Sequence, residues 1–392
     1  MENFVYYNPV EVVFAPKAVD QVGTYAKKLG RKAMLVTYTD ISFFGNLFDR
    51  LHASLDEAGV AWVDYLGAEA NPTLAQARAG VELAKKENAD IIIGVGGGSA
   101  MDCAKVIAAG VCYHEDLARM IQFSHSEATQ VPPEKALPMM MIPTLPATGS
   151  EMNSTAVITD EVTRRKSYVW APQCMYAKTA LIDPELTVTL PAFQTACGAA
   201  DTIAHVTEAY FNGAAENLDL QDRLQEGLIR TVMENVGKVL ENPNDVETRG
   251  VMMWAASLAL NGWLLSGTYG WAPMHQMGHA LSAKFGATHG ATLACMMVAW
   301  LRFFADRPDN ARYVRYADRL FGCGVAEAAD QFEDFLKGIG VPTRISAFGV
   351  KESDIAMLAE HVQEVSFNAD GVMASNPPVT RADVEAIYRL AL

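Results

Sequence analysis

The chain has 392 residues, half of them apolar and a fifth charged, which is the composition of a folded globular protein and not of a disordered one. Its formal net charge of −15 argues against nucleic acid or an anionic membrane as a partner. The length exceeds what one hydrophobic core usually supports, so we expect two domains.

The first part of the chain alternates short, largely apolar runs with amphipathic stretches. The apolar runs predict strands at 32–37, 60–65, 89–95 and 138–142. Predicted helices at 46–58, 72–88 and from Ser99 onward separate them. Buried strands that alternate with helices predict an α/β domain with a parallel, doubly wound sheet.

From Pro191 onward the pattern is helical. Helices are predicted at 193–211, 218–240, 247–266, 276–285, 291–305, 311–321, 326–338, 352–359 and 382–390. The change of pattern falls within DPELTVTLP (183–191), so we divide the chain into an α/β domain, 1–187, and an all-α domain, 188–392. Two closely connected domains favour a ligand cleft between them.

A glycine-rich run, IIIGVGGGSAMDCAK (91–105), joins a predicted strand to a predicted helix. Glycines let the backbone approach a pyrophosphate closely, and a helix N-terminus offers free amides to it. Ser99 suits the N-cap position, with Asp102 completing a capping box. The run departs from the GxGxxG fingerprint and would also suit a plain tight turn, but we favour phosphate binding.

Two further polar segments follow predicted strands. PTLPATGSE (143–151) offers the hydroxyls of Thr144 and Thr148, but from its residues alone we favour an ordinary polar loop. TYTDIS (37–42) carries Asp40, a carboxylate that could bond a ribose 2′-hydroxyl and repel a 2′-phosphate. Asp40 therefore favours NAD(H) over NADP(H).

The histidines form the sharpest pattern. Asp201 and His205 are four residues apart, as are His275 and His279, and His289 follows, so on helices each pair projects from one face. One carboxylate and several imidazoles suit a divalent transition metal. A metal site takes about four protein ligands, so one of the five would be spare for proton transfer, and the spacing alone does not say which. The other four histidines lack partners at ligand spacing: His52, His114, His125 and His361.

These segments, in this order, resemble the iron-containing (group III, metal-dependent) alcohol dehydrogenases, which share the dehydroquinate synthase-like architecture. The butanol-dehydrogenase-like branch is the most similar, and the resemblance runs end to end. The matching segments are ANPT (70–73), GGGSAMDCAK (96–105), PTLPATGSE (143–151), VITDEVTRRK (157–166), DPELTVTLP (183–191), GAADTIAHVTEAY (198–210) and MHQMGHALSAKFGATHG (274–290).

The resemblance implies a metal site between a dinucleotide-binding domain and a helical domain. It implies four metal ligands, Asp201, His205, His275 and His289, and leaves His279 as the catalytic residue near the nicotinamide. Iron(II) is the metal that it implies, while zinc suits the same ligands. The cofactor-lining residues that it implies are Asn71, Gly97, Gly98, Ser99, Asp102, Thr144, Thr148 and Lys166. Lys166 would reach the ribose, although by composition alone it belongs to a surface basic run, 164–166.

The chain departs from the family where the coenzyme is chosen. Many NAD-using relatives have an acid directly after the threonine of the second strand, where this chain has Tyr38. Many NADP-using relatives of the butanol branch have a glycine-rich turn, where this chain has Thr39-Asp40-Ile41. The resemblance therefore leaves the coenzyme open.

Together these features predict a metal- and NAD(P)-dependent alcohol dehydrogenase or aldehyde reductase acting on a small primary alcohol or aldehyde, with a polar or anionic tail as an option. Tyr269 and Trp271 would form an aromatic pocket wall. The alternatives are polyol oxidation of the glycerol-dehydrogenase kind, a sugar-phosphate lyase of the related fold, and a non-catalytic metal-binding protein.

The cysteines and the first residues bear on the cellular setting. None of the six cysteines forms a CxxC pair, which favours free thiols in a reducing compartment. MENFVYYNPV lacks a basic stretch followed by an apolar one, so we expect no secretory signal. We expect a cytoplasmic homodimer or higher homo-oligomer that binds neither membrane nor nucleic acid.

Overall fold

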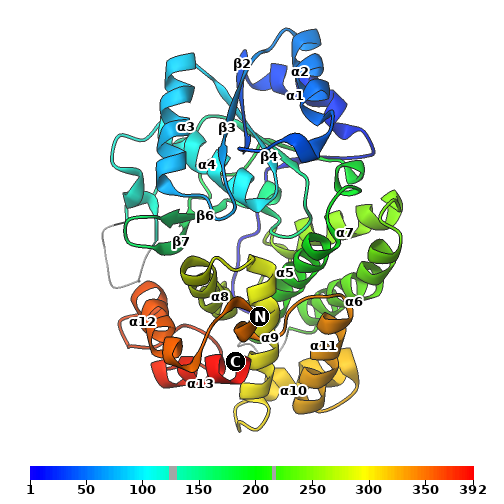
Figure 1. The fold of residues 1–392 in the computed structure, drawn as a ribbon, viewed down its shortest axis with the longest axis vertical. Helices are drawn as coiled ribbons and strands as arrows, with labels where there is room; N and C mark the ends of the chain where they lie inside the picture. The colour runs from blue at the N-terminus through cyan, green and yellow to red at the C-terminus, as the bar shows by residue number, and fades with distance from the viewer. Residues whose placement is uncertain (123–129, 214–217) are drawn as a thin grey trace.

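The computed structural model describes residues 1–122, 130–213 and 218–392, so His125 lies outside the described residues. An α/β part occupies the upper half of the view in Figure 1, and a helical part occupies the lower half. This confirms the predicted fold class. Among the described helices, none is both long and apolar enough to cross a membrane.

The α/β part is built on six parallel strands in the order β1-β8-β5-β4-β2-β3. Their bounds are β1 Glu11–Phe14, β2 Lys32–Tyr38, β3 Ala61–Ala68, β4 Ile91–Gly96, β5 Met139–Pro143 and β8 Thr179–Ile182. The four predicted strands are present within a few residues of their expected bounds. Sequence analysis missed β1 and β8, which have four residues each and show too short a pattern.

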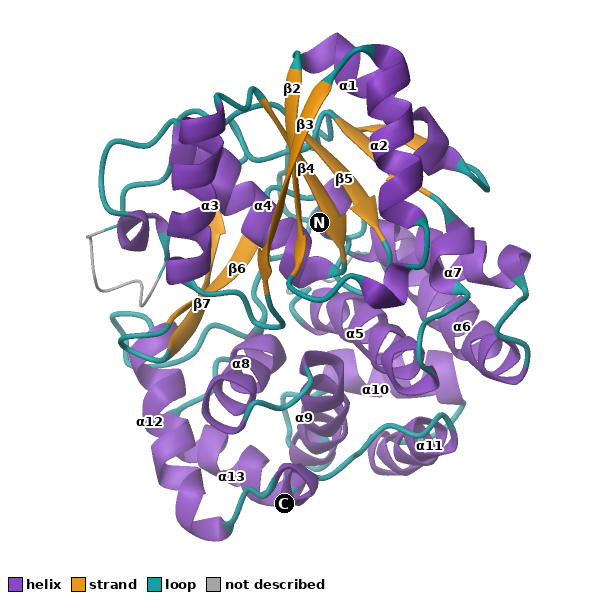
Figure 2. Cartoon of the chain, turned by 45° about the horizontal axis from the view of Figure 1, so that its top comes forward, coloured by secondary structure: helices purple, strands orange, loops and turns teal. Residues whose placement is uncertain are grey.

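Successive side chains of β2 explain why the run is apolar at almost every position. Ala33 and Leu35 pack on one face of the sheet with α1 (Val22–Leu29) and α2 (Leu47–Ala58). Met34 and Val36 pack on the other face with α3 (Leu74–Glu87) and α4 (Gly98–Val111). Because helices cover both faces, both sets of alternating side chains are buried (Figure 2).

The strand order predicts a ligand-binding crevice at the carboxyl ends of β2 and β4. β2 pairs with β3 on one side and with β4 on the other, so the chain order reverses between β2 and β4. In parallel sheets, ligands bind beyond the carboxyl ends of the strands at such a switch point. The turn after Tyr38 and the turn after Gly96 both lie there.

A hairpin that was not predicted follows β5. β6 (Thr155–Asp160) pairs antiparallel with β7 (Arg165–Trp170). β7 contacts helices α8 (Pro273–Phe285) and α12 (Ile355–Ser366) of the helical part. The hairpin lies below α3 and α4 and above α12 in Figure 1. It therefore bridges the two parts on one side of the cleft.

The helical part contains nine α-helices among the residues described after 190. Their bounds are α5 Ala192–Phe211, α6 Asp219–Glu241, α7 Val246–Ala259, α8 Pro273–Phe285, α9 His289–Phe304, α10 Ala311–Phe321, α11 Val325–Gly338, α12 Ile355–Ser366 and α13 Arg381–Ala391. The core forms around α5 and α9, which are buried along most of their length.

Two of these helices differ from prediction. α7 ends at Ala259 and not at 266, because Gly262 has a φ of 90° and the Asn261 side chain accepts a hydrogen bond from the Trp263 amide. α12 runs from Ile355 to Ser366, later than the predicted 352–359, because its buried face continues through Val362 and Val365.

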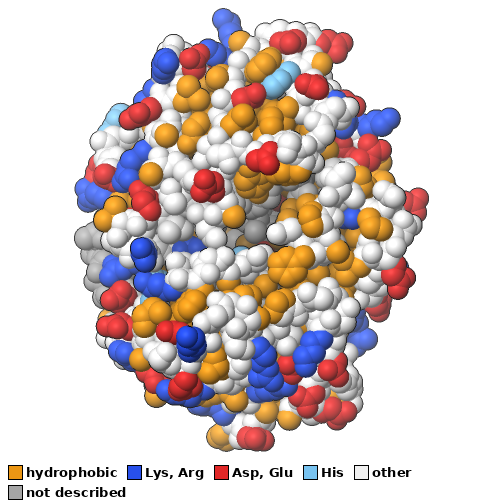
Figure 3. All heavy atoms as spheres, viewed as in Figure 1, with side chains coloured by type: hydrophobic (Ala, Val, Ile, Leu, Met, Phe, Trp, Pro, Cys, Tyr) orange, Lys and Arg blue, Asp and Glu red, His pale blue; other side chains and the backbone are white. Residues whose placement is uncertain are grey.

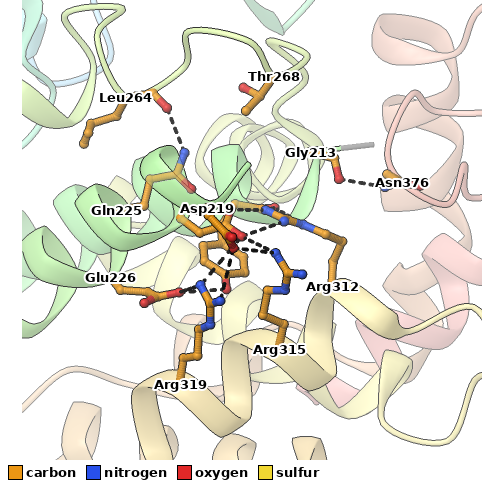
Figure 4. Close-up of polar contacts among 12 residues, drawn as sticks. Gly213, Asp219, Gln225, Glu226, Leu264, Thr268, Arg312, Arg315, Arg319 and Asn376 are labelled. Carbon is orange, nitrogen blue, oxygen red and sulfur yellow. Dashed lines mark hydrogen bonds and ion pairs between the residues drawn. The ribbon is translucent and has the colours of Figure 1, made fainter. Parts of the chain in front are cut away.

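An ion-pair network joins α6 to α10 in the helical part. Asp222, with a fully buried side chain, accepts hydrogen bonds from Arg312 (2.8 and 3.0 Å) and Arg315 (2.8 Å). Figure 4 shows Arg312, Arg315 and Arg319 converging from α10 on the acidic residues of α6. Arg312 also donates to the backbone carbonyl of Tyr210 on α5. The network thus braces the helix that carries Asp201 and His205.

His361 on α12 makes folding stability depend on pH. Its side chain is buried and its Nε2 has no hydrogen-bond partner in the described part of the chain. Burial lowers the pKa of His361 to about 4, and nearby Lys284 and Arg165 lower it further while Glu364 opposes them. The unfolded chain takes up this proton near pH 6.5, so stability is lost as pH falls from about 6.5 towards 4.

We expect His361→Leu to remove the part of the pH dependence of folding stability that His361 causes. Between pH 7 and pH 5 the wild-type chain should lose about 2 kcal/mol more unfolding free energy than the variant. Urea denaturation of both proteins at the two pH values measures the difference. Equal losses in the two proteins would show that His361 does not carry the effect.

Candidate active site

One cavity of about 1340 Å³ lies between the α/β part and the helical part. Figure 3 shows the molecule hollowed at mid-height, with apolar side chains along the rim. All the candidate metal, coenzyme and catalytic residues from the sequence line this cavity: Asp40, Asn71, Gly97, Gly98, Ser99, Asp102, Thr144, Thr148, Lys166, Asp201, His205, His275, His279 and His289.

Three imidazoles surround one carboxylate oxygen at the floor of the cavity. His205 Nδ1, His275 Nε2 and His289 Nε2 lie 3.7, 3.6 and 3.7 Å from Asp201 Oδ1. Ligands bound at 2.0–2.1 Å to a tetrahedral ion lie about 3.4 Å apart. The ligand atoms of Asp201, His205 and His275 all lie within 4.8 Å of one another, so these three residues suit a metal, and His289 lies beside Asp201 as a fourth donor. Helix α5 supplies Asp201 and His205, α8 supplies His275, and His289 is the first residue of α9.

The buried atoms of this cluster lack other partners. Within the described residues, Asp201 Oδ1, His205 Nδ1 and His275 Nε2 are buried and make no hydrogen bond. Leaving such groups unpaired is costly, and one divalent ion would satisfy all of them. The donor set of one oxygen and three nitrogens therefore fits a divalent transition metal.

The electrostatics keep two of the groups in metal-binding forms. Burial raises the pKa of Asp201, but His205, His275 and His289 outweigh burial and hold this pKa well below its usual range. Burial lowers the pKa of His205 to about 4, although Asp201 opposes the shift. Metals bind a deprotonated carboxylate and a neutral imidazole, and both shifts favour those forms.

Glu208 is a member of the site that sequence analysis missed. It is buried on α5, and its Oε2 is hydrogen-bonded to His275 Nδ1, the ring nitrogen that faces away from Asp201. Burial lowers the pKa of His275, but Glu208 and Asp201 together raise it to about 10. The pattern D-x3-H-x2-E puts Asp201, His205 and Glu208 on one helix face, a signal that could have identified Glu208.

His279 stands one turn beyond His275 on α8. Its ring centre lies 5.1 Å from that of His289 and 6.3 Å from that of His275. Its Nδ1 is buried without a hydrogen-bond partner in the described chain. Burial, with Lys166 and the neighbouring histidines, holds the pKa of His279 well below its usual range, so the ring stays neutral.

The glycine turn differs in detail from the expected capping box. Gly97, and not Ser99, is the N-cap of α4, after Gly96 adopts a φ of 146° that only glycine takes readily. Ser99 lies in the first turn of α4, where its Oγ accepts a weak hydrogen bond (3.4 Å) from the Asn71 amide. Asp102 instead accepts from Ser150 Oγ (2.6 Å) and from the Val157 amide (2.8 Å). The capping-box prediction was therefore wrong.

Asp102 has a buried neighbour on α4 that sequence analysis also missed. Lys105 Nζ donates to Asn153 Oδ1 (3.0 Å) and to the Thr155 carbonyl (2.7 Å). Burial lowers the pKa of Lys105 to about 8, although Asp102 and Glu151 oppose the shift. These contacts fasten the glycine turn to the segment after β5, and Thr148 there packs against Gly98 so closely that a Cβ at position 98 would lie 2.5 Å from its Cγ2.

Lys166 is not a surface lysine. The β6–β7 hairpin buries it in the cleft, where its Nζ donates to Asn71 Oδ1 at 2.7 Å. Burial lowers the pKa of Lys166 to about 8, against the opposing charges of Asp102 and Asp201.

The end of β2 and the residues after it also line the cavity. The Tyr38 hydroxyl accepts a hydrogen bond from the Gly97 amide at 3.0 Å, and its ring stacks on Phe44 with centres 6.3 Å apart. Asp40 is exposed, and hydrogen bonds from Ser42 lower its pKa. The acid therefore faces solvent at the mouth of the cavity, while Tyr38 fills the position beside the turn.

The expected aromatic wall is present in part. Trp271 lines the cavity, and Tyr269 stacks on it with ring centres 4.4 Å apart but is not among the described lining residues.

Comparison with known proteins identifies the family. Residues 9–184 match the model of the iron-containing alcohol dehydrogenases, and residues 195–392 match the C-terminal model of the Fe-containing alcohol dehydrogenase family. The chain therefore belongs to the iron-containing alcohol dehydrogenase family. Its similarity to NADH-dependent butanol dehydrogenases and to an NADPH-dependent aldehyde reductase places it in the butanol-dehydrogenase branch, as an oxidoreductase.

Three relatives illustrate the similarity. The chain is 32% identical to NADH-dependent butanol dehydrogenase A of Clostridium acetobutylicum, over 99% of each protein. It is 31% identical to an NADPH-dependent aldehyde reductase of Escherichia coli, over 93% of this chain and 94% of the relative. The crystal structure of NADH-dependent butanol dehydrogenase A from Thermotoga maritima superposes with a TM-score of 0.92 at 34% identity, over 100% of this chain and 99% of the other.

Proposed function

We propose that this chain interconverts a small primary alcohol and its aldehyde, with a divalent metal and a nicotinamide coenzyme. The observation that carries the proposal is the cluster of Asp201, His205, His275 and His289 in the same cavity as the glycine turn. When bound, the metal would supply Lewis-acid polarisation of the substrate oxygen and the nicotinamide would supply or accept the hydride.

Each group of residues has a separate task in this proposal. Asp201 and the three imidazoles hold the metal, with iron(II) as the proposed ion and zinc as the alternative. The turn from Gly97 to Ser99 would hold the pyrophosphate at the start of α4 through the Gly98 and Ser99 amides, because the Gly97 amide already donates to the Tyr38 hydroxyl. The coenzyme would also be lined by Asn71, Thr144, Thr148 and Lys166. Both oxygens of Asp102 already accept hydrogen bonds from the protein, so Asp102 supports the structure of the turn and does not contact the coenzyme.

His279 is the proposed proton carrier. It stands in the cavity beside the metal cluster without a hydrogen-bond partner on Nδ1 among the described residues, so that nitrogen is open to a proton. A buried neutral imidazole next to the reacting centre can take up the hydroxyl proton during oxidation and return it during reduction.

Substituting the proton carrier separates proton transfer from metal binding. We expect His279→Ala to keep a full complement of metal, to lower kcat by about 10²-fold and to change the pH dependence of kcat. Elemental analysis and pH-rate profiles measure the two effects. His205→Ala is the matched comparison and should lose metal and activity together. Metal loss in His279→Ala equal to that in His275→Ala would reverse the assignment of the spare histidine.

The charges around the cavity favour NAD(H) and an uncharged substrate. The described lining residues include no arginine, and Lys166, their one lysine, is engaged with Asn71. No cation among these lining residues therefore stands beside Asp40 to hold a 2′-phosphate, and none other than Lys166 is available for an anionic substrate tail. The same composition disfavours a sugar-phosphate lyase, whereas polyol oxidation stays the second candidate.

The wider setting is also a proposal. Free cysteines throughout the described chain favour a reducing compartment, and we propose the cytoplasm.

Exposed apolar side chains on the N-terminal segment and α7, among them Phe4, Val5, Phe14 and Trp254, favour a homodimer or higher homo-oligomer. We place the domain boundary at 187/188, between the end of β8 and the start of α5.

The proposed function is tested on protein purified without oxygen. We expect about one iron or zinc per chain and oxidation of NADH, faster than of NADPH, with short aldehydes such as butanal. Faster turnover of glycerol than of butanol would favour the polyol candidate. Bound metal with no turnover of any alcohol or aldehyde would contradict the proposal.

A further inference from the structure

Glu208 occupies an unusual position for a buried acid. It lies on α5 one turn beyond His205 and is 3% exposed. Within the described chain, its side-chain hydrogen bonds go to the first turn of α8, the helix that presents His275 and His279 to the cavity. Burying a carboxylate is costly, so a buried carboxylate that is hydrogen-bonded to one member of the metal cluster is expected to have a function in the site.

The two oxygens of Glu208 have different tasks. Oε1 accepts hydrogen bonds from the backbone amides of Met274 and His275, two of the unpaired donors at the start of α8. Oε2 meets His275 Nδ1. The two amides fix which oxygen faces the helix and which faces the imidazole.

This arrangement determines which nitrogen of His275 carries the proton. An ionised carboxylate only accepts hydrogen bonds, so its partner Nδ1 must be the protonated nitrogen. In the neutral imidazole that a metal binds, Nε2, which lies 3.6 Å from Asp201 Oδ1, is then the nitrogen whose lone pair is available to the ion. In the described chain neither His205 nor His289 has a carboxylate on the ring nitrogen that faces away from Asp201.

We propose that Glu208 is a positioning residue that fixes the tautomer and orientation of His275 and thereby sets the affinity of the site for its metal. The inference rests on the proposed function, because it assumes that the cluster around Asp201 holds the ion. It adds a fifth side chain to the site, one that acts through His275 and touches neither substrate nor coenzyme.

The isosteric variant Glu208→Gln separates this role from helix capping. The carbonyl oxygen of the introduced side chain should still accept from the Met274 and His275 amides, because turning the amide around would oppose donors to donors. Its NH2 group would then donate to His275 Nδ1 and force the proton onto Nε2, where the metal binds. Capping is kept, and the tautomer is reversed.

The test titrates zinc(II) into the full chain after its metal has been stripped, in competition with a chromogenic chelator. We expect Glu208→Gln to bind zinc 10- to 100-fold more weakly than wild type, with the melting temperature of the metal-free protein unchanged. Nitrogen-15 NMR of labelled histidines should show His275 Nδ1 protonated in the metal-free wild type and unprotonated in the metal-free variant. Glu226→Gln, a buried acid of α6 away from the cavity, is the matched control and should bind zinc as wild type does.

Three outcomes would overturn the proposal in different ways. Wild-type zinc affinity in Glu208→Gln would show that Glu208 only caps α8. Equal weakening in Glu208→Gln and Glu226→Gln would show a general loss of packing. A wild-type chain that takes up no zinc or iron would overturn the proposed metal site itself, and this inference with it.

Discussion

Asp201→Asn is expected to empty the metal site and to lower kcat/KM by about 10³-fold. Asp201 Oδ1 is the common neighbour of three imidazole nitrogens, at 3.6 to 3.7 Å. It supplies the one negative charge of the ligand set, whereas an asparagine amide is neutral and turns a donor or a weak carbonyl ligand towards the ion. Polarisation of the substrate oxygen by a metal stabilises a transition state by several kcal/mol, and about 4 kcal/mol corresponds to 10³-fold.

The measurement is metal content and aldehyde reduction on the same anaerobic preparation. Asp219→Asn, an exposed acid on α6, is the control and should keep metal and activity. Full metal content with wild-type turnover in Asp201→Asn would show that the ion binds elsewhere.

Asp222→Asn is expected to have the largest effect on stability, about 3 to 5 kcal/mol of unfolding free energy. The buried Asp222 carboxylate compensates Arg312 and Arg315, and removing its charge leaves Arg312 enclosed without a counter-charge. Arg312 also anchors the carbonyl of Tyr210 on α5, so the loss should reach the helix that bears Asp201 and His205.

Asp219 offers a matched comparison on the same helix. Its side chain is 60% exposed, and it meets Arg319 at 3.3 Å, so Asp219→Asn should cost less than about 1 kcal/mol. Urea denaturation of the two variants and the wild type measures both losses. Similar losses in the two variants would contradict the role assigned to the buried network.

The features that sequence analysis captured are those set by local spacing. The i,i+4 pairs Asp201/His205 and His275/His279 lie on helices as expected, because apolar neighbours on both sides define those helices. The glycine turn follows a strand whose residues are buried on both faces, which makes an unbroken apolar run. In both cases a few residues of sequence contain the whole signal.

The features that it missed depend on contacts between distant segments. Lys166 belongs to a charged run and looks exposed, but the β6–β7 hairpin folds it against Asn71, 95 residues earlier. Glu208 is one more polar residue on a helix until α8, 66 residues later, brings its N-terminus against it. Ser99 lost the N-cap position to Gly97 because the backbone turn at Gly96 places the start of the helix two residues earlier. The secondary-structure propensity of a short segment contains no information about these contacts.

The most direct test of the metal assignment is anomalous diffraction at the iron and zinc absorption edges, from crystals of the anaerobically purified chain. The account predicts one peak within about 2.2 Å of Asp201 Oδ1, His205 Nδ1, His275 Nε2 and His289 Nε2, with His279 outside the coordination shell. A metal bound by His279, or an active protein whose metal lies away from Asp201, would contradict it.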